Sequence, residues 1–318
     1  MSRTFRNLIL CLITVLPAEA GDLKLTETKE SLRITLKGKP VLEYLKKEKQ
    51  VPDGMKKSYR RSGYLHPVFS PGGQEVSGDF PEDHPHQHGL FFAWTRTEFD
   101  GSKVDFWNLA KETGRVEFRE MLGKEINDRK ASFSVRHAFV AGKGKARKDV
   151  LDEIWKVTIH QTTDDHFLFD IRSEQKCATQ LPLTLPKYKY GGMAFRGNSQ
   201  WLNSKEGQAN DFRFITSEGK DRLEGNHSRP NWVTMTGMID GKTSTITIMN
   251  HPRNFRSPQA VRLHPEKPYF CFAPMVTGDF QIKPGQPYVS NYRYLVTSKE
   301  PDQKLIERIW QDYQKTAP

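Results

Sequence analysis

Apolar and polar residues alternate along most of the chain, as in β-strands that bury one face and expose the other. Residues 31–36, with the sequence SLRITL, show this pattern. Similar segments, rich in aromatic and β-branched residues, are 131–139, 154–160, 167–173, 232–238, 243–250, 269–273 and 288–297. Asp164-Asp165 and Asp240-Gly241 fit tight hairpin turns. The pattern predicts an all-β chain.

A helical pattern is clearest at the C-terminus. Asp302 can cap a helix that runs to about Tyr313. Its apolar side chains share one face at helical spacing: Leu305, Ile306, Ile309, Trp310 and Tyr313. We expect this face to pack against a sheet.

The chain shows no low-complexity linker and no internal repeat between its strand segments. A single open sheet with so many strands tends to split or curl. We therefore predict one domain over residues 21–318, a large two-layer antiparallel β-sandwich with a short C-terminal helix.

The first 20 residues have the order of a secretory signal peptide. Arg3 and Arg6 precede the apolar run Leu8–Leu16, and Ala18-Glu19-Ala20 supplies small residues for cleavage. The run is too short to span a bilayer comfortably, and no later segment approaches 18 apolar residues. We expect export to the periplasm or the extracellular space and no transmembrane segment.

The chain is basic, with 49 Lys and Arg against 38 Asp and Glu and a net charge of +11. Basic residues cluster at Lys46–Lys49, Lys56–Arg61 and Lys143–Lys148. No basic helix with interleaved aromatic residues is visible, and export also argues against nucleic acid as a partner. A solvated basic surface and a surface for acidic polysaccharide both remain open. Outside the signal segment, Cys177 and Cys271 could pair or stay free thiols.

Three histidines at alternate positions, His84, His86 and His88, are the main candidate for chemistry. Pro85 favours an extended backbone, on which the three imidazoles would share one face. Such rings could hold a divalent transition metal or serve as general acids and bases. Asp83 next to them could ligate, orient a ring or accept a proton.

His66 and His251 also precede proline; His66 lies before the turn Pro71-Gly72-Gly73, and His251 follows the predicted strand 243–250. Sites on β scaffolds usually lie in such places. Arg196 follows the pair Gly191-Gly192, which permits close backbone approach to a ligand, and could bind a carboxylate or hydroxyl cluster. Aromatic side chains could stack on sugar rings or pack in the core: Trp94, Phe106, Trp107 and Trp232.

Several motifs occur in an order that resembles an exported bacterial family known as PmoA-like, or "methane oxygenase PmoA". They are Tyr64-Leu65-His66-Pro67, Pro71-Gly72-Gly73, Asp83-His84-Pro85-His86 with Gly89, Tyr190-Gly191-Gly192 with Arg196, His251-Pro252 with Asn254, and Lys283-Pro284-Gly285 with Tyr292-Arg293-Tyr294. The resemblance runs from about Pro40 to Tyr313. One departure is Gln87, where similar sequences often have another histidine.

The resemblance implies a β-sandwich of the mutarotase-like or lectin-like kind, associated with exported sugar metabolism. The family label itself implies hydrocarbon oxidation. The methane monooxygenase subunit of that name is a multi-span membrane protein, whereas this chain has a mean hydropathy of −0.70. We therefore read the label as an inherited name rather than as an activity.

Two classes of function follow from these residues. In the first, the protein is an exported hydrolase, lyase or epimerase acting on a sugar or sugar derivative. Its catalytic residues would be His84, His86, His66, His251 and Asp83, and its substrate-binding residues Arg196, Tyr190, Trp107 and Asn254.

In the second class, it is a non-catalytic module that binds glycan, or a metal through His84, His86 and His88. A metal-dependent oxygenase with two histidines and a carboxylate is a weaker third option.

Overall fold

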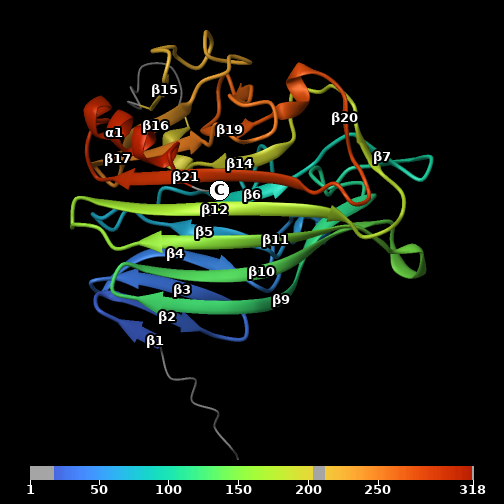
Figure 1. Ribbon diagram of the computed structural model, residues 1–318, viewed down its shortest axis with the longest axis horizontal. Helices are drawn as coiled ribbons and strands as arrows, with labels where there is room; N and C mark the ends of the chain where they lie inside the picture. The colour runs from blue at the N-terminus through green and yellow to red at the C-terminus, as the bar shows by residue number, and fades with distance from the viewer. Residues whose placement is uncertain (1–17, 203–211, 317–318) are drawn as a thin grey trace, which may run out of the picture.

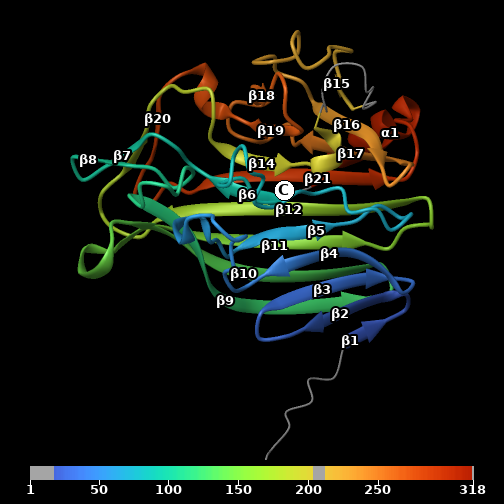
Figure 2. The same ribbon diagram turned by 180° about the vertical axis from the view of Figure 1, so that it is seen from behind.

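Two large antiparallel sheets lie face to face in the computed structural model, which describes residues 18–202 and 212–316 (Figure 1). The nine-stranded sheet has the order β1, β2, β3, β4, β5, β6, β14, β19, β18. Its strands are Ala18–Ala20, Leu23–Glu27, Ser31–Leu36, Lys39–Leu45, Tyr64–Val68, Leu90–Ala93, Gly192–Arg196, Tyr269–Phe272 and Val261–Leu263, in that order. This sheet is nearest the viewer in Figure 2.

The eight-stranded sheet has the order β15, β16, β17, β21, β12, β11, β10, β9. Its strands are Arg213–Thr216, Trp232–Ile239, Lys242–Asn250, Tyr288–Thr297, His166–Cys177, Lys148–His160, Lys130–Ala141 and Gly114–Asn127. A four-stranded sheet flanks them, made of β20 (Phe280–Ile282), β13 (Leu183–Leu185), β7 (Thr97–Phe99) and β8 (Ser102–Val104). The predicted all-β sandwich is confirmed.

Aromatic side chains fill the space between the two large sheets. Phe272 of β19 stacks on Tyr292 of β21 with ring centroids 5.2 Å apart, and Phe270 meets Phe214 of β15 at 6.4 Å. Burying an aromatic side chain of this kind contributes about 1.5–3 kcal/mol. Because side chains alternate along a strand, the neighbours of Phe270 and Phe272 on β19 point to the outer face of the nine-stranded sheet.

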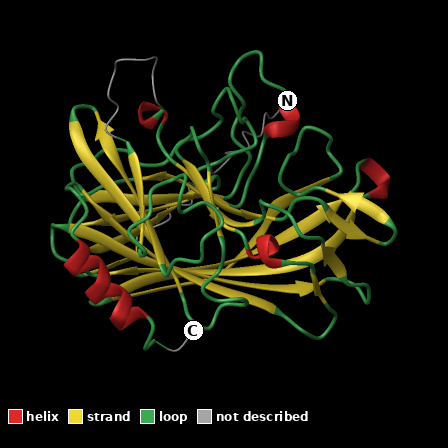
Figure 3. Ribbon diagram, turned by 90° about the horizontal axis from the view of Figure 1, so that it is seen from above, coloured by secondary structure: helices red, strands yellow, loops and turns green. Residues whose placement is uncertain are grey.

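The C-terminal helix α1 (Gln303–Tyr313) lies along the eight-stranded sheet (Figure 3). Asp302 caps it by accepting hydrogen bonds from the backbone N–H groups of Lys304 and Leu305. Its buried face, including Ile306 and Ile309, belongs to a small hydrophobic cluster with Trp232, Met249 and Leu295. The predicted helix and its packing role are confirmed.

The thiols of Cys177 and Cys271 are both free, so they do not form the disulfide that the sequence left open. Within the described part of the chain, no helix is long and apolar enough to cross a membrane. The predicted signal segment falls largely on residues 1–17, which lie outside the described residues.

Candidate functional site

The outer face of the nine-stranded sheet carries most of the side chains that the sequence singled out. In the pairing of β14 with β19, Arg196 lies opposite Tyr269 and Ala194 opposite Cys271. These residues alternate with the core residues Phe195 and Phe270, so they share the outer face. The side chains that meet them come from the segments 78–89, 105–109, 188–190 and 262–267.

The segment 78–89, between β5 and β6, forms a loop that leaves the sheet and returns to it; we call this loop the excursion. Gly89 donates its N–H to the carbonyl of Gly78 at 2.7 Å, which closes the base. Within it the His84 N–H donates to the carbonyl of Pro81 and the Gln87 N–H to that of His84, at 3.1 and 2.9 Å. The segment thus contains two successive turns, and the predicted extended strand through His84, His86 and His88 is wrong. Pro85 at the second position of the latter turn is the signal that should have indicated it.

The turns separate His88 from the other two histidines. Its ring is fully buried, and its Nδ1 lies 2.8 Å from the Asp79 carboxylate. Tyr64 and Phe80 pack against the ring at centroid distances of 5.2 and 4.7 Å. In the described ranges 18–202 and 212–316, no three His, Cys, Asp or Glu side chains are grouped so as to hold a metal ion. The metal-binding triplet His84, His86 and His88 is therefore not formed.

His84 and His86 meet a third imidazole, that of His264, which follows β18. The ring centroid of His84 lies 5.7 Å from that of His86 and 5.4 Å from that of His264. We call these three residues the imidazole cluster. Burial, with a smaller contribution from the neighbouring His84, lowers the pKa of His86 and of His264 to about 4. Both rings are neutral at pH 7.

The two neutral rings differ in their hydrogen bonding. Nδ1 of His264 accepts the backbone N–H groups of Glu266 and Lys267, at 3.2 and 3.1 Å. The His86 ring forms no hydrogen bond with the described residues, and His86 is only partly buried. His86 therefore keeps both ring nitrogens available to a ligand.

Arg196 lies behind the imidazole cluster and is held by two residues of the excursion. Its guanidinium donates to the Gln87 amide oxygen at 2.8 Å and to the Asp83 carboxylate at 3.2 Å. Asp83 also lies 3.1 Å from Nδ1 of His84 and 3.4 Å from Nζ of Lys267. Burial raises the pKa of Asp83, but these cationic and imidazole neighbours outweigh burial and leave that pKa below its ordinary value. Gln87 thus has a role in positioning Arg196.

Asp79 is the centre of a second polar group at the base of the excursion. Its carboxylate accepts the Tyr64 hydroxyl at 2.9 Å and the Lys49 ammonium at 3.0 Å, besides the Nδ1–H of His88. Burial alone would raise the pKa of Asp79, but the bond from His88 and the nearby His66 and Lys49 hold it far below its usual range. The carboxylate is therefore ionised at neutral pH.

His66 faces a pocket of about 440 Å³ on this flank, together with Glu75, Asp79 and Arg196. Its Nδ1 lies 3.0 Å from the Ser77 hydroxyl and its Nε2 3.4 Å from the Glu75 carboxylate. Burial lowers the pKa of His66 to about 4. Arg196 joins the two parts of the face, because it lines this pocket and also binds Asp83 beside His84.

Three aromatic rings, those of Trp107, Tyr190 and Tyr269, form a cluster on the same outer face. Their centroids lie 6.0 to 6.1 Å apart. Trp107 and Tyr269 are buried, whereas Tyr190 is only partly buried. The guanidinium of Arg262 lies over the Tyr190 ring, 5.2 Å from its centroid. Tyr190 is therefore the ring that a ligand can reach.

Two predicted site residues are not brought to this face. His251 follows β17 of the eight-stranded sheet and packs against Tyr313 of α1, with ring centroids 4.9 Å apart. Asn254 donates its amide to Asn250 and to the backbone carbonyl of Asn291, so it braces the loop after β17. The prediction that His251 and Asn254 complete the site is a misassignment, because their strand belongs to the other sheet.

Other polar residues of interest were missed by the sequence reasoning. His264 carried a signal, since it too precedes proline. Arg262 and Tyr269 lie on short strands that are buried throughout, so no alternation marked their outward face.

A buried polar network between the sheets was also missed. Nδ1 of His137 lies 2.8 Å from Glu153, and Nε2 lies 2.5 Å from the Tyr44 hydroxyl. Glu153 also accepts from Ser173 and Gln175 at 2.6 and 2.8 Å.

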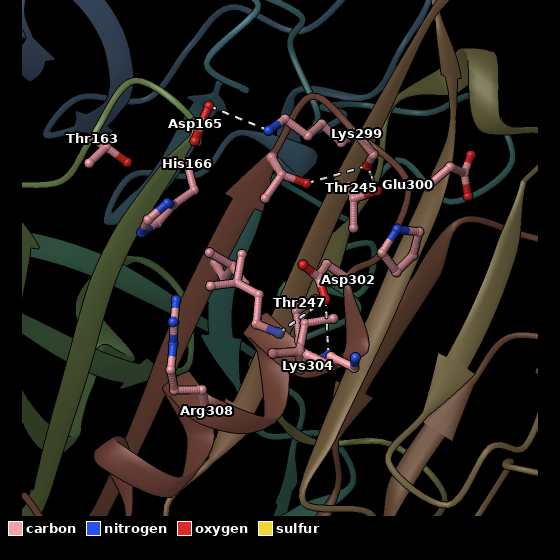
Figure 4. A pocket seen from close by; sticks show the side chains of 15 residues that line it. Thr163, Asp165, His166, Thr245, Thr247, Lys299, Glu300, Asp302, Lys304 and Arg308 are labelled. Atoms are coloured by element: carbon pink, nitrogen blue, oxygen red, sulfur yellow. Dashed lines mark hydrogen bonds and ion pairs between the residues drawn. The ribbon is translucent and has the colours of Figure 1, made fainter.

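A further pocket, of about 490 Å³, lies on the eight-stranded sheet beside the start of α1 (Figure 4). Thr245 and Thr247 form one wall, and His166 and Arg308 lie together on the other side. The Asp302 carboxylate already satisfies the first N–H groups of the helix. None of the catalytic, substrate-binding or metal-binding residues predicted from the sequence lines this pocket. We therefore place the candidate site on the outer face of the nine-stranded sheet.

The chain is thus an antiparallel β-sandwich with histidine, arginine and aromatic side chains gathered on one outer face. It belongs to the family of unknown function DUF6807, whose model matches residues 31–311. No curated protein matches the sequence.

Solved structures of low similarity match most of the chain. A galactose mutarotase-like protein from Clostridium acetobutylicum is 10% identical, with 87% of this chain and 95% of that chain covered and a TM-score of 0.34. Heparan sulfate lyase from Pedobacter heparinus is 9% identical, with 91% of this chain and 37% of that chain covered and a TM-score of 0.35. This chain therefore spans well under half the length of that lyase. With similarity at this level, we do not carry the activities of those proteins over.

Proposed function

We propose that this protein binds a sugar or sugar derivative on the outer face of the nine-stranded sheet and acts on it by histidine acid–base chemistry. The observation that carries the proposal is the state of His86. Its imidazole is neutral, partly buried and without a hydrogen bond to the described residues. It lies beside His84, on the same sheet face as the aromatic cluster.

The polar groups around His86 suit a hydroxylated ligand. Neutral imidazoles can both accept and donate hydrogen bonds, and a general base needs a free ring nitrogen within reach of the proton it takes. The positive charge of Arg196, held by Asp83 and Gln87, can fix a carboxylate or hydroxyl pair of the ligand. Tyr190 offers a ring for stacking on a sugar.

The charges near His86 also set when it can act as a base. Burial lowers its pKa most, His84, His88 and Arg196 lower it further by smaller amounts, and Asp105 raises it. A ligand that brings a negative charge against Arg196 would offset the repulsion from its guanidinium and raise the pKa of His86. The base would then be strongest when the substrate is bound.

Within this proposal, His84 and Asp83 orient the cluster, Arg196 and Tyr190 bind substrate, and Trp107 supports Tyr190. The reaction class is hydrolysis, elimination or epimerisation, in the exported setting that the N-terminal sequence predicts. The resemblance to the PmoA-like family stays a prediction. The oxidation that its name implies would need a metal held by two histidines and a carboxylate, such as His84, His86 and Asp83, and no such group is formed among the described residues.

A non-catalytic glycan-binding module is the second candidate, and one observation favours it. The aromatic cluster and Arg262 form a stacking surface that needs no proton transfer to hold a sugar.

The test compares the protein with His86→Gln and with the control His160→Gln, which changes a histidine of the other sheet. Neutral oligosaccharides and oligogalacturonates are the probes. New reducing ends, absorbance of unsaturated products and epimer ratios by NMR report the three reaction classes.

We expect His86→Gln to lower kcat/KM at least about 100-fold, as loss of a general acid or base does, and His160→Gln to leave it unchanged. If the protein binds a probe without turning it over, and His86→Gln weakens that binding, the protein is the binding module and not an enzyme. If His86→Gln leaves turnover and binding unchanged, both the enzyme and the binding-module proposals for this site are refuted.

A further inference from the structure

We infer that the pocket next to the aromatic cluster is a subsite for an acidic sugar residue, so that the ligand is an anionic oligosaccharide or polysaccharide. The pocket has a volume of about 680 Å³, within the range of sites for small ligands. Its walls come from β7, β8 and the segments 105–113 and 186–188. The inference rests on the proposed function, because it extends the same ligand beyond His86.

A continuous row of rings connects the two places. Trp107 and Tyr190 are neighbours at 6.1 Å, and Tyr190 and Tyr188 at 6.0 Å. Tyr188 lines the pocket, and the Arg96 guanidinium stacks on its ring at 4.1 Å from the centroid. A sugar chain lying along Tyr190 therefore reaches the pocket at Tyr188.

Four cationic side chains line the pocket: Arg96, Lys103, Lys111 and Lys187. None of their charged groups forms an ion pair or a hydrogen bond with the described residues. Arg96 makes only the stacking contact on Tyr188, which leaves its in-plane N–H donors free for an anion.

The acidic side chains of the pocket are mostly engaged elsewhere. The Asp105 carboxylate accepts from the Thr95 hydroxyl, the Asn108 amide and two backbone N–H groups, at 2.7 to 3.1 Å. Glu112 pairs with Lys143 at 3.0 Å. Asp105 keeps its negative charge, because all its donors are neutral, so Asp105 and Glu98 are the two carboxylates that oppose the four cations. The pocket therefore favours an anion, and a carboxylate or a sulfate on a sugar has that chemistry.

The experiment measures binding by calorimetry to three probes: an oligogalacturonate, a sulfated dextran oligosaccharide and a neutral dextran oligosaccharide. The variant Lys103→Gln/Lys187→Gln removes two cations from the pocket. The matched control, Lys156→Gln/Lys242→Gln, removes two exposed cations from the eight-stranded sheet. Thermal unfolding checks that both variants are folded.

We expect at least one anionic probe to bind more tightly than the neutral one. The pocket variant should weaken that binding about tenfold, since each exposed ion pair contributes modestly, and the control by less than about twofold. Preference for the galacturonate identifies a carboxylate, and preference for the sulfated probe a sulfate. Equal weakening by both variants, or no preference for an anion, would overturn the inference.

A second substitution separates this inference from the proposed function. Tyr188→Ala should weaken binding of the anionic probe, while Tyr188→Phe should not, because stacking needs the ring and not the hydroxyl. If His86→Gln abolishes turnover but the Tyr188 and lysine variants bind normally, the subsite is wrong and the proposed function stands. If the pocket variants lose affinity while His86→Gln changes nothing, the subsite stands and the proposed function is wrong.

Discussion

Lowering the pH from 7 to 5 should destabilise the protein, because the burial of His66 and the partial burial of His86 favour their neutral forms. Burial lowers the pKa of each to about 4 in the folded state, against about 6.5 in an unfolded chain. Between these values the unfolded state binds more protons than the folded state, so stability falls as the pH falls. The linkage relation gives a loss of about 2 kcal/mol for each histidine on going from pH 7 to pH 5.

Urea unfolding at the two pH values measures this loss directly. Wild type should lose about 4 kcal/mol from these two groups, a large part of the roughly 5–15 kcal/mol by which domains are stable. His66→Gln and His86→Gln should each remove about 2 kcal/mol of the pH dependence. Single variants with the full wild-type pH dependence would refute the assigned burial of these rings.

Three further predictions concern stability and are checked by urea midpoints at pH 7. Glu153→Leu leaves the buried donors of His137, Ser173 and Gln175 without their acceptor and should cost about 3–5 kcal/mol, whereas a loss below about 1 kcal/mol would show that the network is not formed. Asp79→Asn keeps one acceptor oxygen but sets an amide donor among the donors that Asp79 accepts, and should cost about 2 kcal/mol; an unchanged midpoint would contradict that geometry. Ile309→Ala should cost about 2 kcal/mol if α1 packs on the sheet as described, and almost nothing if the helix is undocked.

The long strands could be predicted from the sequence because one of their faces is buried and the other is not. Strand β12 alternates between buried and partly buried residues along most of its length, and the segment 167–173 showed that alternation. Strands β6 and β14 are buried at every position, so their pattern has no period of two. The sequence therefore missed the strands that form the centre of the candidate site.

The candidate site could be predicted in part. Arg196, His84 and Asp83 do lie together, because the excursion 78–89 and the end of β14 are joined by backbone hydrogen bonds. His88 was assigned to the wrong face because two turns replaced the expected strand.

His251 and Asn254 were misassigned for a different reason. Position along the chain does not say to which sheet a strand belongs. Strand β17 pairs with β16 and β21 in the eight-stranded sheet, and its loop therefore ends beside α1.

The measurement that tests the central claim most directly is an NMR titration that observes the imidazole side chains while an oligogalacturonate or a neutral oligosaccharide is added. The account predicts saturable shifts of the His84, His86 and His264 signals, lost in His86→Gln, with a rise in the pKa of His86 when the ligand is anionic. Saturable binding that shifts His166, in the pocket beside α1, and leaves those three signals unchanged would contradict it.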